Sequence, residues 1–515
     1  MHYNFQQATG NRQQATWPTY KLNSSKLSSY FSFFTKVYFF TKIYKITQNF
    51  ARSSHRSISS PQILLPLVPS ILLAFSFTST ALTSTTTNFI HGEVPYFTFD
   101  GGNTRVTDTE GLLRIHLSNG QQYSPSNNNS SATNPIELPT IDESFADISM
   151  LVPVDSNSVD LNTIVAAPYN YWGDDDGDSE VTATGSISLS IVDKNNQTVS
   201  RNTVPMYCKA PYKATLTNTE GTLTTRYGVP NSIKFGAGSV TYYFKPKESP
   251  AICFAKPNNL AYTAPPYVGP ETVWNYGKGF LTQTATPSSY GLNFPTTGAN
   301  GLYFDLDISN NDQALTWDPV SHSGITATMT NSTNTSVRVT LTGPAATLEQ
   351  WNSSNPEKVA KPSLPQTFEI VGRDSSGNAV VKYGFELKQW FVNRGNVIGN
   401  HDNQLSWCTN IGYHLPNVRD LTNAVYPSNE QLITATPPSP GNHYQRNIGA
   451  GLITEWGFLL YYANTNFNLY YWTNDMYTHG GDYKYYFYAH ADHGLIHWVD
   501  PATFYNGVCV SDLTP

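Results

Sequence analysis

The chain has 515 residues, a formal net charge of −7 and only 13% charged residues. Residues 1–60 carry eight Lys and Arg and no Asp or Glu, so the remainder has a net charge of about −15, which excludes nucleic acid and an anionic membrane surface as partners. The length fits about three to four domains, and the abundance of Thr, Ser, Asn and Tyr in place of charge favours a mainly β extracellular protein.

The first 84 residues are predicted to precede the folded part of the protein. Residues 1–60 contain no apolar run of the length that a membrane span requires, and we expect a disordered or non-native extension there. Residues 61–84 have the layout of a secretory signal peptide, because Arg52 and Arg56 precede the apolar run 63–77 and small residues follow it. A buried strand or a short anchor is the alternative. Secretion, or a place on the outer cell surface, is the expected localisation.

The next two regions are predicted to be rich in β-structure. Residues 85–166 include a polar low-complexity tract and are expected to form an irregular β module with a polar linker. Residues 167–290 are expected to form an immunoglobulin-like β-sandwich. In this sandwich the segments 181–192 and 199–206 flank the turn 193–196, which predicts a hairpin.

A second immunoglobulin-like β-sandwich is predicted over residues 291–395. Short strands separated by turn residues recur without a long helical pattern, which is typical of sandwiches. The expected strands are 301–308, 324–329, 337–341, 367–371 and 379–391, the last two flanking a turn at 373–378.

The last region, residues 396–515, is predicted to begin with two short helices and to end in a small antiparallel sheet. Cys408 lies in the first helical pattern, and Gly412 follows as a helix-terminating glycine. Asn417 and Asp420 have the spacing of a capping box at the start of the second helix. Aromatic-rich runs with turn residues between them follow and indicate strands.

Several short motifs in residues 405–510 carry a family resemblance. They are Trp407-Cys408, Gly412-Tyr413-His414-Leu415-Pro416, Glu455-Trp456-Gly457, Tyr471-Trp472-Thr473 and Gly507-Val508-Cys509-Val510. Together with the order of elements, they resemble the C-type-lectin-like fold at the C-terminus of bacterial invasin- and intimin-type adhesins. The resemblance implies a mainly β protein in which immunoglobulin-like β-sandwich domains are followed by a small α+β C-type-lectin-like domain that binds host-cell surfaces.

Adhesins of this family usually anchor through an N-terminal outer-membrane barrel, whose alternating strands do not precede the predicted sandwiches here. We therefore expect either release of the protein or a separate outer-membrane export or anchoring partner.

The four cysteines indicate two disulfides in an oxidising compartment. Three connectivities can be drawn for four cysteines, and we favour the sequential pairs Cys208 with Cys253 and Cys408 with Cys509, because domains usually close on themselves. Each pair then lies inside one predicted domain. No Cys-x-x-Cys spacing occurs, which argues against zinc-binding and redox motifs.

An acidic run at residues 174–180 is a candidate metal site. Asp174, Asp176 and Asp178 are the residues that we expect to bind calcium, because a hard cation relieves the repulsion among close carboxylates. Gly177 precedes the third acidic residue, so the calcium-loop spacing of helix-flanked sites is not met. A solvated acidic turn between domains is the alternative. No other cofactor is expected.

Two further patterns in the C-terminal region suggest ligand chemistry. Residues 471–475, Tyr-Trp-Thr-Asn-Asp, are similar to the strand with which sugar-binding C-type lectins coordinate calcium, but the Glu-Pro-Asn or Gln-Pro-Asp loop that those lectins also need does not occur, and we take Trp472 to be a packed core residue. Histidines and aspartates gather nearby and offer a metal site, for which solvated turns are the alternative. They are His479, Asp482, His490, Asp492, His493 and His497.

The aromatic C-terminal strands are the predicted receptor-binding surface. Rings occur on both strand faces, so some should be exposed, and exposed Tyr and Trp anchor protein interfaces and stack on sugars. The predicted receptor-binding residues are Tyr483, Tyr486, Tyr488, His490, Asp492, His493 and Trp498.

The resulting prediction is a secreted or cell-surface bacterial adhesin with a role in virulence, whose partner is a host-cell surface protein or glycan. A metal-independent glycan-binding module is the first alternative. We expect no enzymatic activity, because no nucleophile-elbow, HExxH or phosphate-loop motif occurs. An extracellular hydrolase is a further alternative; Asp305 and Asp307 share a strand face, as residues two apart do by default.

Overall fold

The computed structural model describes residues 92–258, 264–427, 433–478 and 483–512. These residues belong to one compact unit, Thr86–Pro515. The predicted extension at 1–60 and the predicted signal peptide at 61–84 lie outside the described residues. In the described part of the chain, no helix has the length and apolarity to cross a membrane.

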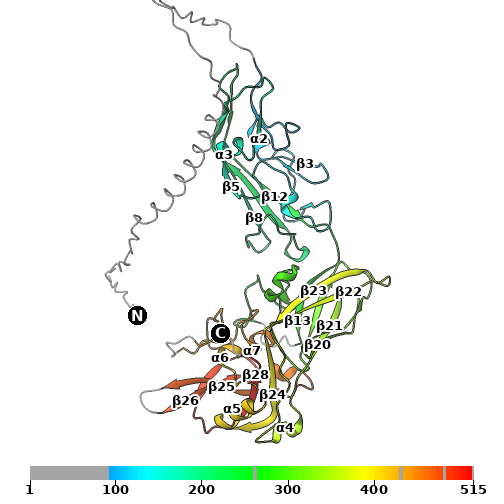
Figure 1. The fold of residues 1–515 in the computed structure, drawn as a ribbon, viewed down its shortest axis with the longest axis vertical. Helices are drawn as coiled ribbons and strands as arrows, with labels where there is room; N and C mark the ends of the chain where they lie inside the picture. Colours follow the sequence, from blue (N-terminus) through cyan, green and yellow to red (C-terminus); the bar gives the residue numbers. More distant parts are fainter. Residues whose placement is uncertain (1–91, 259–263, 428–432, 479–482, 513–515) are drawn as a thin grey trace, which may run out of the picture. The chain divides into compact units, whose positions relative to one another are not determined.

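The first group of sheets confirms the mainly β fold class (Figure 1). A five-stranded sheet has the strand order β4-β12-β9-β8-β5, and a three-stranded sheet has the order β11-β10-β7. Their bounds are β4 Ile136–Glu137, β5 Ser158–Asp160, β7 Thr182–Thr184, β8 Ser186–Val192, β9 Tyr212–Asn218, β10 Gly221–Thr224, β11 Ser232–Phe235 and β12 Gly238–Lys245. Smaller elements here are β1 Tyr96–Phe97, α2 Thr109–Leu112, β2 Ile115–His116, β3 Gln122–Tyr123, η1 Phe145–Asp147, α3 Leu161–Val165, β6 Trp172–Gly173 and η2 Tyr207–Lys209.

One hydrophobic core runs from Phe97 to Phe244 and serves this whole group, which we call core 1. Strands β8 and β9 alternate buried and less buried residues, as strands with one face on a core do. Strands β4 and β5, from the predicted irregular module, pair with β12 and β8 at the two edges of the five-stranded sheet. The sheet therefore spans the predicted boundary between residues 166 and 167.

The predicted hairpin between 181–192 and 199–206 is wrong in its second strand. Strand β8 pairs instead with β9, whose first residue lies 20 positions after β8 ends. Arg201 explains the difference, because its buried guanidinium donates to the carbonyl oxygens of Ile148, Val152 and Pro153 at 2.7–3.1 Å. These hydrogen bonds hold Arg201 against residues 148–153, so the pairing with β8 ends after the bridge of Val192 with Thr198 and the hydrogen bond from the Val199 amide to the Ile191 carbonyl at 2.9 Å.

The second group of sheets is a sandwich. A seven-stranded sheet has the order β14-β15-β13-β17-β21-β20-β19, and a three-stranded sheet has the order β18-β22-β23. Phe304 of β17 meets Phe385 of β23 edge to face at 5.9 Å between ring centroids, so the two sheets pack face to face. The bounds are β13 Ala251–Pro257, β14 Trp274–Asn275, β15 Gly279–Leu281, β17 Tyr303–Ser309, β18 Thr316–Trp317, β19 Val320–His322, β20 Ile325–Thr330, β21 Ser336–Thr342, β22 Gln366–Arg373 and β23 Ala379–Leu387, with η3 Pro287–Leu292 and α4 Leu348–Asn352 between strands.

The predicted strands of this sandwich are confirmed, including the hairpin of β22 and β23, except that the predicted strand 379–391 is divided. Strand β23 ends at Leu387, and residues 389–391 begin β24 (Gln389–Gly399), which belongs to the C-terminal sheet. The turn of the hairpin is closed by the Asp374 amide donating to the Asn378 carbonyl at 3.0 Å. Strand β13, however, pairs with β17 and therefore places residues 251–257 in this sheet, across the predicted boundary between 290 and 291.

The C-terminal region is a six-stranded sheet with three short helices, which we call the C-terminal module. The strand order is β16-β24-β28-β25-β26-β27, in which β16 pairs with β24, and β25 with β28, in parallel. The elements are β16 Thr297–Ala299, β24 Gln389–Gly399, α5 His401–Asn410, α6 Val418–Leu421, α7 Leu452–Trp456, η4 Leu459–Tyr461, β25 Tyr470–Thr478, β26 Lys484–His490, β27 Ile496–Val499 and β28 Tyr505–Val510.

The two predicted helix signals in this module are confirmed. Helix α5 ends at Asn410, and Gly412 follows with a φ of +87°, a conformation that residues with a Cβ rarely adopt. The Asp420 carboxylate accepts the amide of Asn417 at 2.8 Å, which closes the predicted capping box of α6. Helix α6 is short and ends at Leu421.

A single hydrophobic core, which we call core 2, runs from Ile252 to Val510 through the sandwich and the C-terminal module. Strand β16 comes from the sandwich segment of the chain but pairs with β24 in the C-terminal sheet. The predicted boundary between residues 395 and 396 falls inside strand β24. The sandwich and the C-terminal module therefore fold as one body.

Candidate functional site

The register of β26 and β27 determines which aromatic side chains reach the surface of the C-terminal sheet. Along β26, Phe487 and Ala489 are buried, while Tyr486, Tyr488 and His490 alternate with them and are partly exposed. Side chains two residues apart share a face, so these three lie on the side of the strand opposite Phe487 and Ala489, where Tyr486 and Tyr488 still pack partly against core 2.

Neighbouring strands extend this outer surface into a patch of aromatic and imidazole rings. Tyr470 of β25 is the register partner of His490, and His497 of β27 is the partner of Tyr488. Ring centroids are 4.5 Å apart for Tyr488 and Tyr505 and 4.6 Å for Tyr470 and His490. We call this patch of Tyr470, Tyr488, His490, His497 and Tyr505 the Tyr488 face.

Burial perturbs the titration of two groups in the Tyr488 face. Desolvation raises the pKa of Tyr488, and the neighbouring Tyr505 adds to the shift. Desolvation lowers the pKa of His490, and the nearby His493 lowers it further. At neutral pH both groups are therefore uncharged, and they offer a hydroxyl and an imidazole for hydrogen bonding.

Tyr486 has a more structural role than its neighbours on the same strand. Its ring stacks on that of His401, with centroids 3.6 Å apart and planes 16° from parallel. His401 lies at the start of α5, is buried, and has a ring nitrogen 3.2 Å from the Thr473 carbonyl oxygen. Helix α5 therefore covers this end of the outer surface, and Tyr486 packs against it.

Trp498 lies on the opposite side of the sheet from the Tyr488 face. It is the register partner of Phe487, stacks on Tyr477 at 5.0 Å and meets Tyr485 at 4.8 Å. Tyr483 lies just before β26 and is 75% exposed, the highest exposure among the large hydrophobic side chains of the described residues. The predicted receptor-binding residues are thus divided between two faces and a strand end.

The structure brings His490, Asp492 and His493 together in the turn between β26 and β27. One ligand atom from each lies within 4.8 Å of the other two. Asp492 Oδ1 is 3.8 Å from His490 Nδ1 and makes a close contact with His493 Nδ1. Desolvation opposes ionisation of Asp492, but the hydrogen bond and charge of His493 outweigh it and lower the pKa of Asp492. The predicted members His479 and Asp482 lie outside the described residues.

The acidic loop uses its carboxylates for hydrogen bonds within the loop and for contacts with Glu93 and Arg105. Asp174 Oδ1 accepts the amides of Asp176 at 2.9 Å and Asp178 at 3.4 Å, and Asp176 Oδ2 accepts the amide of Glu93 at 2.5 Å. Asp175 pairs with Arg105. Desolvation and the charges of Asp174 and Asp176 raise the pKa of Asp178. A calcium ion on this loop stays a prediction.

The residues of the Trp-Thr-Asn-Asp segment contact the rest of the protein. Trp472 is fully buried, and its Nε1 donates to the Gly399 carbonyl at 3.0 Å. Asp475 Oδ2 accepts the amide of Val418, the first residue of α6, at 2.5 Å. Asp475 therefore caps a helix, and burial raises the pKa of its carboxyl. Asp305, a candidate for a hydrolase, is held at both oxygens by Arg338 at 2.8 and 2.9 Å.

Both predicted disulfides are present, and the described residues contain no free cysteine. Cys408 and Cys509 are fully buried and join α5 to β28 inside core 2. Cys208 and Cys253 instead form a small separate cluster with Phe254 and Leu281.

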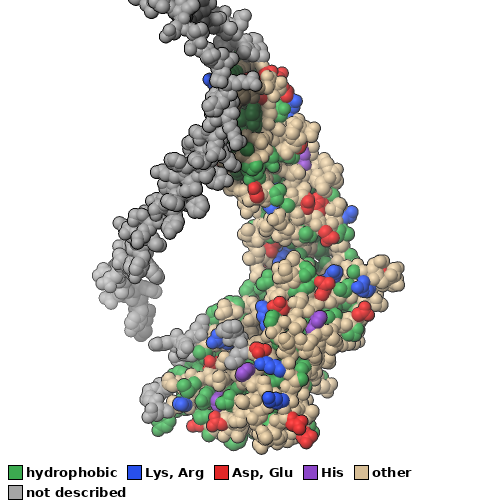
Figure 2. Space-filling view, viewed as in Figure 1, with side chains coloured by type: hydrophobic (Ala, Val, Ile, Leu, Met, Phe, Trp, Pro, Cys, Tyr) green, Lys and Arg blue, Asp and Glu red, His purple; other side chains and the backbone are tan. Residues whose placement is uncertain are grey.

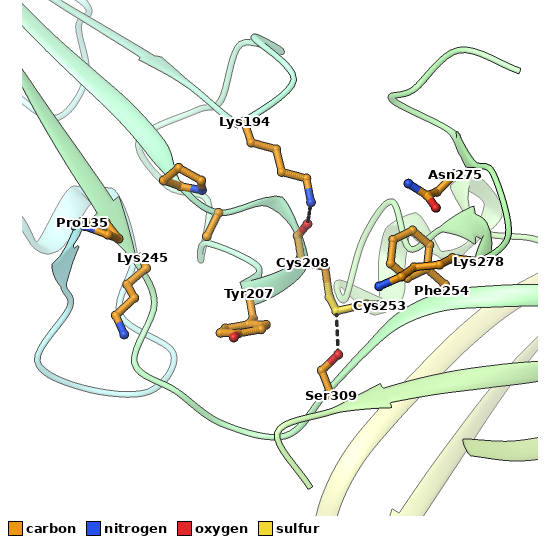
Figure 3. A pocket seen from close by; sticks show the side chains of 12 residues that line it. Pro135, Lys194, Tyr207, Cys208, Lys245, Cys253, Phe254, Asn275, Lys278 and Ser309 are labelled. Carbon is orange, nitrogen blue, oxygen red and sulfur yellow. Dashed lines mark hydrogen bonds between the residues drawn. A yellow bond between two sulfur atoms is a disulfide. The ribbon is translucent and has the colours of Figure 1, made fainter. Parts of the chain in front are cut away.

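A cavity of about 460 Å³ lies beside the Cys208–Cys253 disulfide (Figure 3). The Nζ of Lys194 donates to the Cys208 carbonyl, and Ser309 Oγ lies 3.6 Å from Cys253 Sγ. Lys245 also lines the cavity, but its charge is compensated by Glu137 at 2.9 Å and by Glu248. None of the predicted receptor-binding residues lines it.

Sequence analysis did not single out two residues of the C-terminal module. Tyr470, a member of the Tyr488 face, was not among the predicted receptor-binding residues, although its spacing of two residues from Trp472 along β25 offered a signal. The role of Glu455 as a buried anchor had no signal beyond its place in a motif. Its carboxylate accepts the amides and hydroxyls of Thr296 and Thr297 at 2.6–3.1 Å and the Gly449 amide at 2.8 Å.

No protein-family model and no curated protein matches this chain. Among solved structures, the chain is similar to invasin, described as a bacterial integrin-binding protein, with 14% identity and a TM-score of 0.31 over 65% of this chain and 52% of that chain. It is similar to a C-terminal 282-residue fragment of intimin, solved in complex with the intimin-binding domain of the translocated intimin receptor, with 11% identity and a TM-score of 0.29 over 64% of this chain and 93% of that chain. An intimin mutant of EHEC O157:H7 gives 14% identity and a TM-score of 0.26 over 46% of this chain and 92% of that chain. The chain thus spans about half the length of the invasin structure.

Proposed function

We propose that this protein is a bacterial adhesin, secreted or held at the outer surface, whose C-terminal module binds a receptor on a host cell. The observation that carries the proposal is the Tyr488 face, a patch of partly exposed tyrosine and histidine rings on a sheet fixed by core 2. The motif resemblance of residues 405–510 to invasin- and intimin-type adhesins supports the same proposal. A separate export or anchoring partner is part of it.

The physical case rests on rigid aromatic anchors. Tyrosine supplies a large contact area with few rotatable bonds, so binding costs little side-chain entropy. Tyr470, Tyr488 and Tyr505 pack against one another with centroids 4.5–6.0 Å apart, which restricts their rotamers before a partner arrives. Figure 2 shows hydrophobic side chains reaching the surface around β25 and β26 among mostly uncharged polar atoms. Such a surface suits a contact that excludes water.

A glycan is the second candidate ligand, and the composition of the same patch favours it. Tyrosine rings stack on the apolar faces of sugars, while the adjacent imidazoles of His490 and His497 can hydrogen-bond to hydroxyl groups.

Binding of the purified, oxidised, full-length chain to cultured epithelial cells tests the proposal. The whole chain is used because the C-terminal module shares core 2 with the sandwich. We expect saturable binding that falls by about tenfold or more in Tyr470→Ser/Tyr488→Ser, as for two anchors of an interface. The matched control is Tyr276→Ser, which removes a 69% exposed tyrosine beside β14 and should leave binding unchanged.

Enzymatic removal of surface glycans separates the two ligands. Binding that survives the treatment identifies a protein receptor, and binding that disappears identifies a glycan. If the wild-type chain does not bind, or if the double variant and the control bind equally well, the proposal is overturned.

A further inference from the structure

The turn between β26 and β27 contains the one group of three or more His, Cys, Asp or Glu side chains within metal-binding distance among the described residues. We propose that His490, Asp492 and His493 form a binding site for a divalent transition-metal ion of the zinc class. The site shares His490 with the Tyr488 face, but it does not rest on the receptor-binding proposal, because binding of an ion requires only the turn itself.

The ligand atoms are already close to the positions that an ion requires. Zinc lies about 2.0–2.2 Å from nitrogen and oxygen ligands, so two ligands of one ion stand roughly 3–4 Å apart. One ligand atom from each residue lies within 4.8 Å of the others, and Asp492 Oδ1 is 3.8 Å from His490 Nδ1. Small side-chain rotations suffice to close the remaining distance.

The backbone of the turn is fixed by hydrogen bonds within the turn and with two other segments of the chain. Across the turn itself, the His490 amide donates to Leu495 and the Gly494 amide donates to His490, at 2.8 and 2.9 Å. The Ala491 amide donates to the Leu469 carbonyl at 2.8 Å, and the His493 carbonyl accepts the Tyr444 amide at 2.9 Å.

Packing fixes the turn further. The Ala491 side chain is fully buried, and the Ala491 carbonyl accepts the Leu459 amide at 3.1 Å. Gly494 has a φ of +71°, and a Cβ added there would lie 2.7 Å from Thr422 Oγ1. The three ligand residues are therefore held on a rigid support, which lowers the cost of binding an ion.

Partial burial and ligand chemistry identify the class of ion. The side chains of His490, Asp492 and His493 are 17%, 17% and 23% exposed, so an ion would be partly shielded but still open to water on one side. Two imidazoles and one carboxylate suit zinc and its neighbours, with water completing the coordination. Calcium and magnesium prefer oxygen ligands and larger coordination numbers, which this set does not offer.

The side chains around the turn favour a bound ion over solvent in the space between the three ligand residues. Tyr470 and Tyr488 stand beside His490, with ring centroids 4.6 and 5.5 Å away, and limit the access of water. The ion pairs of Asp492 are with the two histidines, so the carboxylate already faces both nitrogen ligands.

Equilibrium dialysis against zinc tests the site in the tag-free, oxidised, full-length chain after treatment with a chelator. We expect one tightly held zinc per chain, and cobalt in its place should show the visible absorption of a low-coordinate site. Asp492→Asn and His493→Gln should each weaken zinc binding by more than about tenfold, given that even indirect partners of metal ligands cost 10- to 100-fold.

His414→Gln is the matched control, because His414 is an exposed histidine of the same module outside the turn. Near-ultraviolet circular dichroism verifies that each variant is folded, and His490→Gln replaces any variant that is not. The proposal is overturned if the wild-type chain retains no zinc, if calcium binds in its place, or if the turn variants bind zinc as tightly as the control.

Discussion

The two disulfides follow the same rule in the sequence but act in different places in the structure. Cys408 and Cys509 are fully buried within core 2, which the sandwich and the C-terminal module share. Cys208 and Cys253 belong to neither core 1 nor core 2 and form their own small cluster. The Cys408–Cys509 bond lies within a single folded body. The Cys208–Cys253 bond instead links the segment before β9 to β13, the first strand along the chain of the seven-stranded sheet. Sequential pairing therefore does not by itself identify a domain.

The largest expected effect comes from removing the disulfide inside core 2. Cys408→Ala/Cys509→Ala should lower the free energy of unfolding of residues 251–510 by about 5 kcal/mol, because the bond closes a loop with a sequence separation of 101 residues. Urea titration followed by tryptophan fluorescence measures this. A loss below about 1 kcal/mol would contradict the assignment of this bond to the stability of core 2.

Removing the other disulfide should affect core 1 and leave core 2 unchanged. Cys208→Ala/Cys253→Ala opens a loop with a sequence separation of 45 residues. We expect the free energy of unfolding of residues 92–247 to fall by about 4 kcal/mol. Differential scanning calorimetry should show the unfolding transition of core 1 at a lower temperature than in the wild type and the transition of core 2 at the same temperature. A shift of both transitions by the same amount would show that the two cores unfold together and would remove the contrast between the bonds.

Glu455 provides a third way to examine core 2, because it joins α7 to the segment that leads into β16. Glu455→Ala leaves the buried amides of Thr296, Thr297 and Gly449 without an acceptor, and we expect a loss of about 3 kcal/mol or more. Glu357→Ala, which removes an exposed carboxylate, is the control and should stay within about 0.5 kcal/mol of the wild type. If both variants have the same stability, the Glu455 hydrogen bonds do not contribute to holding the sandwich and the C-terminal module together.

The smallest effect is a pH dependence from the same carboxyl. Burial raises the pKa of Glu455 above its usual 4.5, although hydrogen bonds from Thr297 and Thr296 partly oppose the shift. The folded state thus holds this proton more tightly than the unfolded state, so its contribution to stability is full below pH 4.5 and is lost as the pH rises through the folded pKa.

Comparison with Glu455→Gln isolates that contribution. The unfolding free energy of the wild type, relative to the variant, should fall with increasing pH by at most about 1.4 kcal/mol per pH unit. Urea titrations at several pH values above 4.5 measure the difference. Parallel curves for the two proteins would exclude a raised pKa.

Features set by short stretches of chain could be predicted from the sequence. The Gly412 helix end depends on one residue, and the capping box depends on Asn417 and Asp420, three residues apart. The turn that brings His490 and His493 together is likewise local. Short strand-like segments separated by turn residues also predicted the strands of the second sandwich, two of which alternate buried and less buried residues.

Features that depend on distant parts of the chain could not be predicted. Glu455 meets Thr297 across a sequence separation of 158 residues, and no local pattern encodes that contact. Trp498 and Tyr488 both lie in aromatic strands, and only the strand register places them on opposite faces. In the neighbouring pair of strands, an irregularity between Trp472 and Met476 shifts the register of β25 against β26. Such a shift follows from packing across strands.

The Cys408–Cys509 bond also determines how the protein responds to tension. When the chain is pulled at its ends, this covalent link prevents extension of the stretch between the two cysteines, whose sequence separation is 101 residues. Fully extended, that stretch would have a contour length of about 350 Å. Under the proposed adhesin function, shear load would reach the chain through its receptor contact. The strands that carry the Tyr488 face lie inside the bridged stretch, so they are protected from extension for as long as the bond remains oxidised.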